Sequence, residues 1–366
     1  MAVAATRAPL VLGILTSLLL PLLQLLLSAP PVEPSCAGGR PVIFNFGDSN
    51  SDTGGLSAGL GYPFPQQDGR AFFHRSSGRL CDGRLVIDFL CESLNTSYLR
   101  PYMDPLGWDF SNGANFAAAG STTLPPDIPF ALAIQVLQFR RFKMRSLELI
   151  AQGFIFSLLL CSLSSNLHAQ VSSFHYSLSC MTDIIPLFIV QFLRIWTQNL
   201  YNDGGRKFWV VNTGPLGCLP QKLAMPREDY SVLDPLGCLI PFNNAAKEFN
   251  TQLGALCDKL RYELEDATIV YTDMYSIKYD LIANYDKYGF ETAIMACCGY
   301  GGAPYNFNQK IECGSPNCQV CPLGSKYISW DGVHYTEAAN AIVASKILTT
   351  QYSKPNLQFD YFCSTA

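Results

Sequence analysis

The sequence predicts an α/β fold in which a central, mainly parallel sheet is covered by helices on both faces. Three short apolar runs, residues 41–46, 208–211 and 267–271, have the length and composition of buried strands. A longer stretch, residues 242–264, separates the last two runs and carries apolar side chains at every third or fourth position, as one face of a helix does. Apolar strands that alternate with helices favour a parallel sheet with both faces covered.

Two further segments complete this predicted framework. Residues 83–94 carry apolar side chains at helical spacing, with Asp82 near their start, and residues 336–348 form a closing helix with Thr336 as its expected N-cap. In parallel sheets, sites form where the strands end. The first predicted strand ends in Gly47-Asp48-Ser49, so we expect Asp48 and Ser49 at the carboxyl edge of the sheet.

The composition limits the classes of function. The chain has 366 residues, of which 49% are hydrophobic and 15% charged, and it is long enough for one large domain or two small ones. Its formal net charge is −4, and no basic patch is evident in the sequence. We therefore expect no nucleic-acid partner.

The N-terminus is predicted to be an export signal. Arg7 is the single charge before an apolar run over residues 10–27, and small residues and prolines follow this run. This order predicts a secretory signal peptide over residues 1–36, with cleavage between residues 29 and 37. A membrane anchor is the alternative, but polar residues and a proline interrupt the run, and no basic cluster follows. We expect a secreted protein, extracellular or in the cell wall, without stable membrane insertion after cleavage.

The cysteine content also favours an oxidising, extracellular compartment. The chain has 14 cysteines; Cys297 and Cys298 are adjacent, and Cys313, Cys318 and Cys321 crowd a short stretch after them. A zinc site is the alternative there, but no histidine follows until residue 334. Disulfides are the favoured interpretation, and the sequence leaves their pairing open.

One N-glycosylation sequon is present, Asn95-Thr96-Ser97. It predicts a glycan on Asn95 and hence a surface position for this residue. An unused sequon is the alternative.

Serine-hydrolase chemistry is indicated by two separate runs. A serine hydroxyl is a poor nucleophile unless an imidazole takes its proton, and the chain has four histidines. His334 follows Asp331 by three residues, a spacing at which the carboxylate can orient the imidazole inside one turn. Ser49 follows a strand, where its hydroxyl and its backbone N–H can face a substrate. Taken alone, each run also fits an ordinary polar loop or a surface turn.

Together the runs resemble the plant GDSL esterases/lipases, which belong to the SGNH hydrolase superfamily. Residues 44–54, Phe-Asn-Phe-Gly-Asp-Ser-Asn-Ser-Asp-Thr-Gly, resemble the first block of that family, and residues 330–340, Trp-Asp-Gly-Val-His-Tyr-Thr-Glu-Ala-Ala-Asn, resemble its last block. The resemblance covers roughly residues 41–350 with one gap. Further family-like runs lie between the two blocks, in order, at residues 83–89, 113–121, 212–220 and 296–301.

The resemblance implies a single SGNH-hydrolase domain over residues 37–366, a flavodoxin-like three-layer α/β/α fold. It implies that Ser49 is the nucleophile and first oxyanion donor, that the N–H of Gly120 is the second donor, and that Asp331 and His334 complete a triad. The implied reaction transfers the acyl group of a carboxylic ester to water through an acyl-serine, without metal or organic cofactor. Lipid, acetylated carbohydrate and phenolic esters are all open as substrates, as is acyl transfer to another acceptor.

The sequence departs from the family at the third block. A Gly-x-Asn-Asp run, whose asparagine should be the third oxyanion donor, is absent, and the segment at about 146–182 is atypical. Residues 153–180 are rich in Phe, Ser, Leu and Cys, which pyrimidine-rich codons specify. One hypothesis is therefore that translated intron or a mis-spliced exon replaces the authentic block. Counting back from Ile185-Pro186 instead selects Asn166 as the third donor. A secreted GDSL-fold glycoprotein with impaired catalysis is the alternative to an active enzyme.

Overall fold

The computed structural model describes residues 41–104, 106, 109–123, 129–152, 166–170 and 185–363. The predicted signal segment, residues 1–36, lies outside the described residues, as does most of the atypical segment. Among the described residues, no helix combines the length and the apolar character that a membrane crossing requires.

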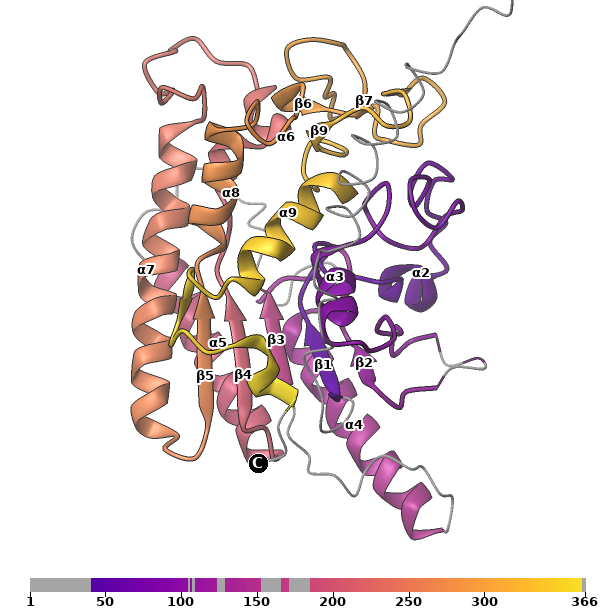
Figure 1. Cartoon of the computed structure of the whole chain (residues 1–366), viewed down its shortest axis with the longest axis vertical. Helices are drawn as coiled ribbons and strands as arrows, with labels where there is room; N and C mark the ends of the chain where they lie inside the picture. Colours follow the sequence, from indigo (N-terminus) through magenta and orange to yellow (C-terminus); the bar gives the residue numbers. More distant parts are fainter. Residues whose placement is uncertain are drawn as a thin grey trace, which may run out of the picture.

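The centre of the fold is a six-stranded sheet with the order β10-β5-β4-β3-β1-β2 (Figure 1). Neighbouring strands are parallel, except that β10 runs antiparallel to β5. Without β10 the spatial order is 2-1-3-4-5, which is the order of flavodoxin-like sheets. The strands are β1 (Ile43–Phe46), β2 (Gly113–Asn115), β3 (Asn166–Gln170), β4 (Lys207–Val211), β5 (Thr268–Thr272) and β10 (Ser353–Lys354).

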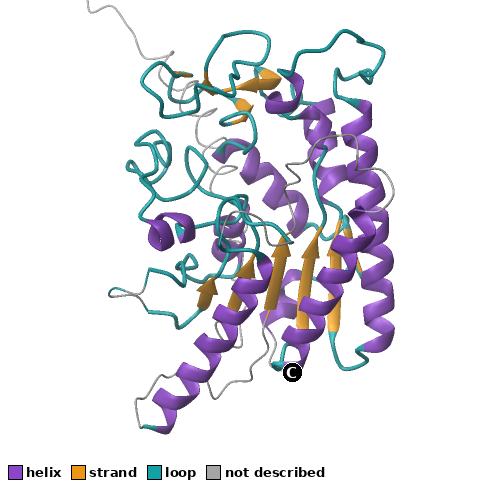
Figure 2. Ribbon diagram, turned by 180° about the vertical axis from the view of Figure 1, so that it is seen from behind, coloured by secondary structure: helices purple, strands orange, loops and turns teal. Residues whose placement is uncertain are grey.

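Helices cover both faces of this sheet. Successive strand side chains point to opposite faces, so Trp209 and Val211 join one buried cluster whereas Phe208 and Val210 join the other. The first cluster packs against α3 (Val86–Ser93), α8 (Met274–Ala283) and α9 (Glu337–Leu348), which lie in front of the sheet in Figure 1. The second packs against α4 (Leu132–Ala151), α5 (Ile185–Asn202) and α7 (Ile240–Glu263), and Figure 2 shows α4 and α5 in front of the sheet when it is seen from behind. The predicted α/β architecture is confirmed.

Most predicted elements are found within a few residues of their expected bounds. The three apolar runs form β1, β4 and β5, and the amphipathic stretch forms α7. Thr336 caps α9 as predicted, because its side chain accepts a hydrogen bond from the amide of Ala339. The helix predicted from residue 83 begins instead at Val86. Asp82 does not start it, because its Oδ1 accepts the amide of Glu337, at the first turn of α9.

Short elements and disulfides build the remainder. The disulfides Cys297–Cys321 and Cys298–Cys313 tie down the loop after β6, which confirms the disulfide interpretation of that cysteine cluster, and Cys218–Cys238 closes a second loop. Two small sheets, β6 with β9 and β7 with β8, lie beside these bonds. The short elements are α2 (Gly55–Leu60), η2 (Leu216–Cys218), α6 (Pro220–Leu223), β6 (Thr292–Ala296), β7 (Cys298–Gly299), β8 (Gln319–Val320), β9 (Tyr327–Ser329) and η3 (Phe359–Cys363).

Candidate active site

Ser49 lies in a tight turn just beyond the carboxyl end of β1. The carbonyl of Asp48 accepts the amide of Ser51, and its carboxylate accepts both the amide and the side-chain N–H of Asn50. Gly47, with φ of 151°, leads the chain from the strand into this turn. Ser49 is thereby fixed at the edge where parallel sheets place their sites, with 7% of its surface exposed.

Ser49, His334 and Asp331 form one chain of hydrogen bonds. His334 Nε2 lies 2.7 Å from Ser49 Oγ, although the two residues are 285 positions apart. His334 Nδ1 lies 2.6 Å from Asp331 Oδ2. The other carboxylate oxygen, Asp331 Oδ1, accepts the amides of Val333 and His334 at 2.9 and 2.8 Å. These bonds close the turn from Asp331 to His334. The sequence-predicted triad residues are thus brought together in the geometry of a serine nucleophile with its base.

The electrostatics of the pair favour a proton on the imidazole. Burial acts to lower the pKa of His334, but the charge and hydrogen bond of Asp331 outweigh it and the pKa is raised. Burial acts to raise the pKa of Asp331, and the same interaction with His334 brings it below its usual value. The pair therefore stabilises the imidazolium that forms when Ser49 gives up its proton.

Gly120 occupies the loop after β2 in a left-handed conformation, with φ of 77°. The amides on either side of it are used, since Ala119 donates to Asp52 and Ser121 donates to the carbonyl of Ala118. Among the described residues, the amides of Ser49 and Gly120 have no hydrogen-bond acceptor. Two backbone donors are therefore available on the two loops at this edge.

Asp52 ties these two loops together. Its buried carboxylate accepts the amides of Gly54, Gly55 and Leu56 within its own loop. It also accepts the amide of Ala119 at 2.7 Å, directly before Gly120. The serine turn and the glycine turn are therefore held in one arrangement by a single carboxylate.

Gln135 of α4 is a second, fully buried link between the loops. Its Oε1 accepts the amide of Gly47 at 2.9 Å, and its Nε2 donates to the carbonyl of Gly47 and to Ser121 Oγ, both at 2.8 Å. Sequence reasoning missed both linking residues. Asp52 stands inside the first family-like block, which is a usable signal, whereas Gln135 lies 88 positions from Gly47 on an ordinary helix.

Asn166 is not brought to Ser49. It is the first residue of β3, paired with Ile43 at the amino end of β1, whereas Ser49 lies beyond the other end of that strand. The length of β1, roughly 10 Å at the usual rise of a strand, separates the two positions. The prediction of Asn166 as third oxyanion donor is therefore wrong; Ala169 and Gln170 are the residues at the carboxyl end of β3.

The sequon asparagine, Asn95, follows α3 and is exposed, with a left-handed φ of 52°. Its predicted surface position is confirmed. The glycan itself stays a prediction.

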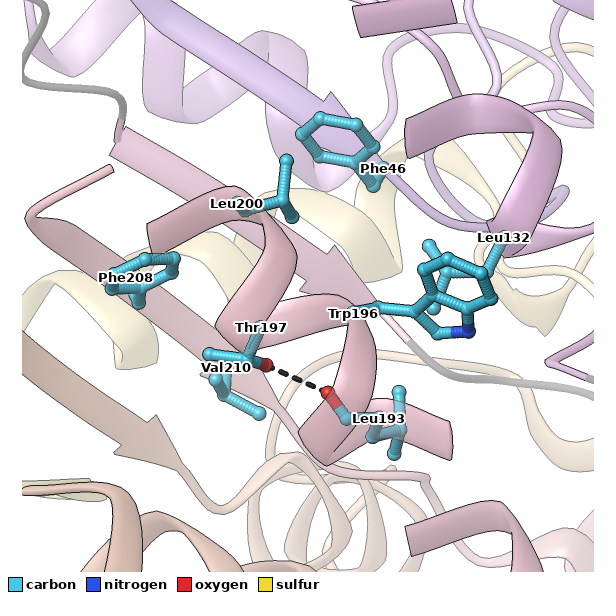
Figure 3. A pocket seen from close by; sticks show the side chains of 8 residues that line it. All are labelled: Phe46, Leu132, Leu193, Trp196, Thr197, Leu200, Phe208 and Val210. Carbon is cyan, nitrogen blue, oxygen red and sulfur yellow. Dashed lines mark hydrogen bonds between the residues drawn. The ribbon is translucent and has the colours of Figure 1, made fainter. Parts of the chain in front are cut away.

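The pocket in Figure 3 is separate from the site and lies between α5 and the sheet, on the α4 and α5 face. Its single hydrogen bond among the residues drawn joins Thr197 Oγ1 to the carbonyl of Leu193. The lining holds no titratable side chain, so this is packing space in the core. The lining residues are Phe46, Leu132, Leu193, Trp196, Thr197, Leu200, Phe208 and Val210.

Comparison with known proteins gives a consistent result. Residues 43–347 match the model of the GDSL-like Lipase/Acylhydrolase family. The chain is 54% identical to the GDSL esterase/lipase LIP-4 of Arabidopsis thaliana over 358 residues, which cover 94% of this chain and 95% of the relative. A second GDSL esterase/lipase of that plant is 55% identical over 88% of this chain and 90% of its own. Alpha-L-fucosidase 3 of the same plant is 39% identical over 89% of this chain and 94% of its own. The chain therefore belongs to the GDSL-like lipase/acylhydrolase family and is a carboxylic ester hydrolase.

Proposed function

We propose that this ester hydrolase acts through an acyl-serine formed on Ser49, with His334 as general base and Asp331 as the group that orients it. The observation that carries the proposal is the unbroken series of hydrogen bonds from Asp331 to His334 at 2.6 Å and from His334 to Ser49 at 2.7 Å. No other residue is needed to move the proton between nucleophile and base.

The first half of the reaction acylates the enzyme. His334 Nε2 takes the proton from Ser49 Oγ while the oxygen attacks the ester carbonyl carbon. The oxyanion of the tetrahedral intermediate accepts the amides of Ser49 and Gly120. When the intermediate collapses, His334 returns the proton to the leaving alkoxide, and the alcohol departs from acyl-Ser49.

The second half repeats these steps with water. His334 removes a proton from water, whose oxygen attacks the acyl carbon, and the same two amides accept the new oxyanion. Collapse releases the carboxylic acid, and the proton returns to Ser49 Oγ. Bonds and protons balance without a further reactant.

Catalysis through two backbone donors is the form we propose. Loss of one side-chain donor costs on the order of 10²–10³ in turnover, which weakens an enzyme but does not abolish it. The hypothesis that residues 153–180 derive from intron or a mis-spliced exon is separate from this chemistry, and sequencing of the transcript tests it. A spliced message that encodes the stretch without interruption would contradict it.

We also propose that the protein is secreted after removal of residues 1–36 and works as a single SGNH-hydrolase domain over residues 37–366. The disulfides at Cys297 and Cys298 support an oxidising compartment, and the exposure of Asn95 supports its glycosylation. Lipid, acetylated carbohydrate and phenolic esters are the substrate classes proposed.

Turnover of p-nitrophenyl acetate by the purified protein tests the proposal, with Ser49→Ala beside Ser51→Ala. Ser51 is the matched control, because its hydroxyl is buried two residues away and has no hydrogen-bond partner in the described part of the chain. We expect the first variant to lose turnover and the second to keep it. Equal turnover by folded Ser49→Ala would overturn the mechanism, and equal, negligible turnover by all three folded proteins would favour the impaired glycoprotein.

A further inference from the structure

A buried carboxyl group outside the triad contacts the segment that carries His334. Asp68, in the loop between α2 and α3, is 1% exposed. Its Oδ1 accepts the indole N–H of Trp330 at 2.8 Å, while its Oδ2 is buried and has no hydrogen-bond partner among the described residues. An unpartnered buried carboxylate oxygen is costly, so its presence calls for a physical reason.

Trp330, the residue that Asp68 binds, is the first residue of the turn that ends at His334. Trp330 is fully buried and directly precedes Asp331. Its amide donates to the carbonyl of His334 at 2.7 Å, so the turn from Trp330 to His334 is closed on itself. The guanidinium of Arg70 lies over the indole ring at 5.2 Å. Asp68 thus reaches the Asp331–His334 pair through one rigid side chain.

The charges around Asp68 couple it to that pair. Burial raises the pKa of Asp68 to about 7, the hydrogen bond from Trp330 and the charge of His334 act to lower it, and Asp331 and Asp82 act to raise it. In return, the pKa of His334 is lowered by burial and raised by the negative charges of Asp331, Asp48 and Asp68, in that order of size. Asp68 therefore changes its charge near neutral pH, where a histidine base also titrates.

We propose that Asp68 is a positioning residue of the ester hydrolase: it holds the Trp330–His334 turn, and its negative charge strengthens His334 as the base. The proposal rests on the triad mechanism proposed above.

Loss of the Asp68 charge should shift the pH dependence of the enzyme toward lower pH. An anion beside His334 favours the imidazolium, so removing it lowers the pKa of His334. Half-protonation of His334 then occurs at a lower pH, and the acid limb of the kcat/KM profile moves down with it. The same change weakens the base, so the plateau at higher pH falls.

The pH profile of kcat/KM for p-nitrophenyl acetate, taken from about pH 5 to about pH 9, tests the proposal in the wild type, Asp68→Asn and the control Asp109→Asn. Asparagine keeps an oxygen for the indole of Trp330 and removes the charge. We expect its acid limb to move down by about one unit, the low end of the effect of a neighbouring charge, with a plateau several-fold lower. Asp109→Asn removes an exposed carboxylate from the loop before β2, where it accepts the amide and the hydroxyl of Ser111, so its limb should stay in place.

A lower plateau with an unmoved limb in Asp68→Asn would overturn the proposal, because a purely structural role lowers the rate without moving the limb. If that variant does not fold, Trp330→Phe replaces it. Loss of the indole N–H keeps Asp68 neutral to higher pH, so the limb should move in the same direction, and an unmoved limb contradicts the proposal equally.

Titration of the His334 ring protons by NMR separates this inference from the proposed mechanism, since it needs no turnover. The comparison uses Ser49→Ala with and without Asp68→Asn. A lower His334 pKa in the double variant upholds the role of Asp68 even where the esterase assay fails, and identical pKa values overturn it even where the assay succeeds.

Discussion

The two segments that meet at the active site are held in place by different kinds of interaction. The nucleophile loop, residues 47–56, is fixed by buried hydrogen bonds to Asp52 and Gln135. The histidine segment, residues 297–335, is fixed by two disulfides and by the buried indole of Trp330. Their reactive atoms nevertheless meet within 2.7 Å.

The difference reflects what each segment can bury. The nucleophile loop joins a central strand to a helix, so its amides find partners in the surrounding core. The histidine segment contains the short strands β7, β8 and β9 and long irregular stretches, and covalent cross-links are the usual support where a core is small. Stability and catalysis should therefore respond differently to changes in the two segments.

The largest effect is expected where the two segments meet. His334→Ala removes the base, and we expect kcat to fall by on the order of 10⁶. This is the size of loss seen when one member of a cooperating nucleophile–base pair is removed. His74→Ala is the control, because His74 is exposed and, within the described part of the chain, its ring bonds only to the carbonyl of Arg70. A fall of less than about tenfold in folded His334→Ala would remove His334 from the mechanism.

The second largest effect is expected inside the histidine turn, at Asp331. Asp331→Asn keeps an oxygen for the amides of Val333 and His334 but loses the charge that orients the imidazole. We expect kcat to fall by about 10⁴ with little change in Tm. A large drop in Tm with unchanged kcat would mean that Asp331 only closes the turn.

In the wild type, the raised pKa of His334 sets the acid side of the pH profile. Activity is expected to be present while His334 is neutral and to be lost as the pH falls through a value above 6.5, the ordinary histidine pKa. An acid limb below that value would contradict the net effect of Asp331 on His334.

Removing a cross-link should destabilise the histidine segment without changing its chemistry. Cys298→Ser with Cys313→Ser opens a loop of 15 residues, and we expect unfolding to become easier by about 3 kcal/mol. Thermal unfolding measures this, with the unpaired Cys318→Ser as control. Unchanged Tm in the double variant would show that the segment needs no covalent support.

The smallest effect is expected in the polar network of the nucleophile loop. Gln135→Leu leaves the buried amide and carbonyl of Gly47 without that partner, so we expect a loss of about 1–3 kcal/mol in stability. Gln138→Leu is the matched change on the same helix, since Gln138 Oε1 has no hydrogen-bond partner in the part that the structure describes. Equal Tm values for the two variants would contradict the role given to Gln135.

Sequence reasoning succeeded where the signal is local. The apolar runs predict β1, β4 and β5 because buried strands need continuous apolar residues, and Asp331 and His334 share one turn. It failed where the position of a residue depends on contacts with residues far away in the sequence. Asp68 meets Trp330 across 262 positions, and no local pattern marks such a contact. Asn166 was selected by counting along the chain, whereas strand register, which is set by neighbouring strands, placed it at the wrong end of β3.

The central claim is that Ser49 becomes covalently acylated with the help of His334. Incubation of the wild type and of His334→Ala with a fluorophosphonate, followed by peptide mass spectrometry, tests it most directly. The account predicts one adduct on the peptide that contains Ser49, and its loss in His334→Ala. An adduct on another serine, or none on folded wild-type protein, would contradict it.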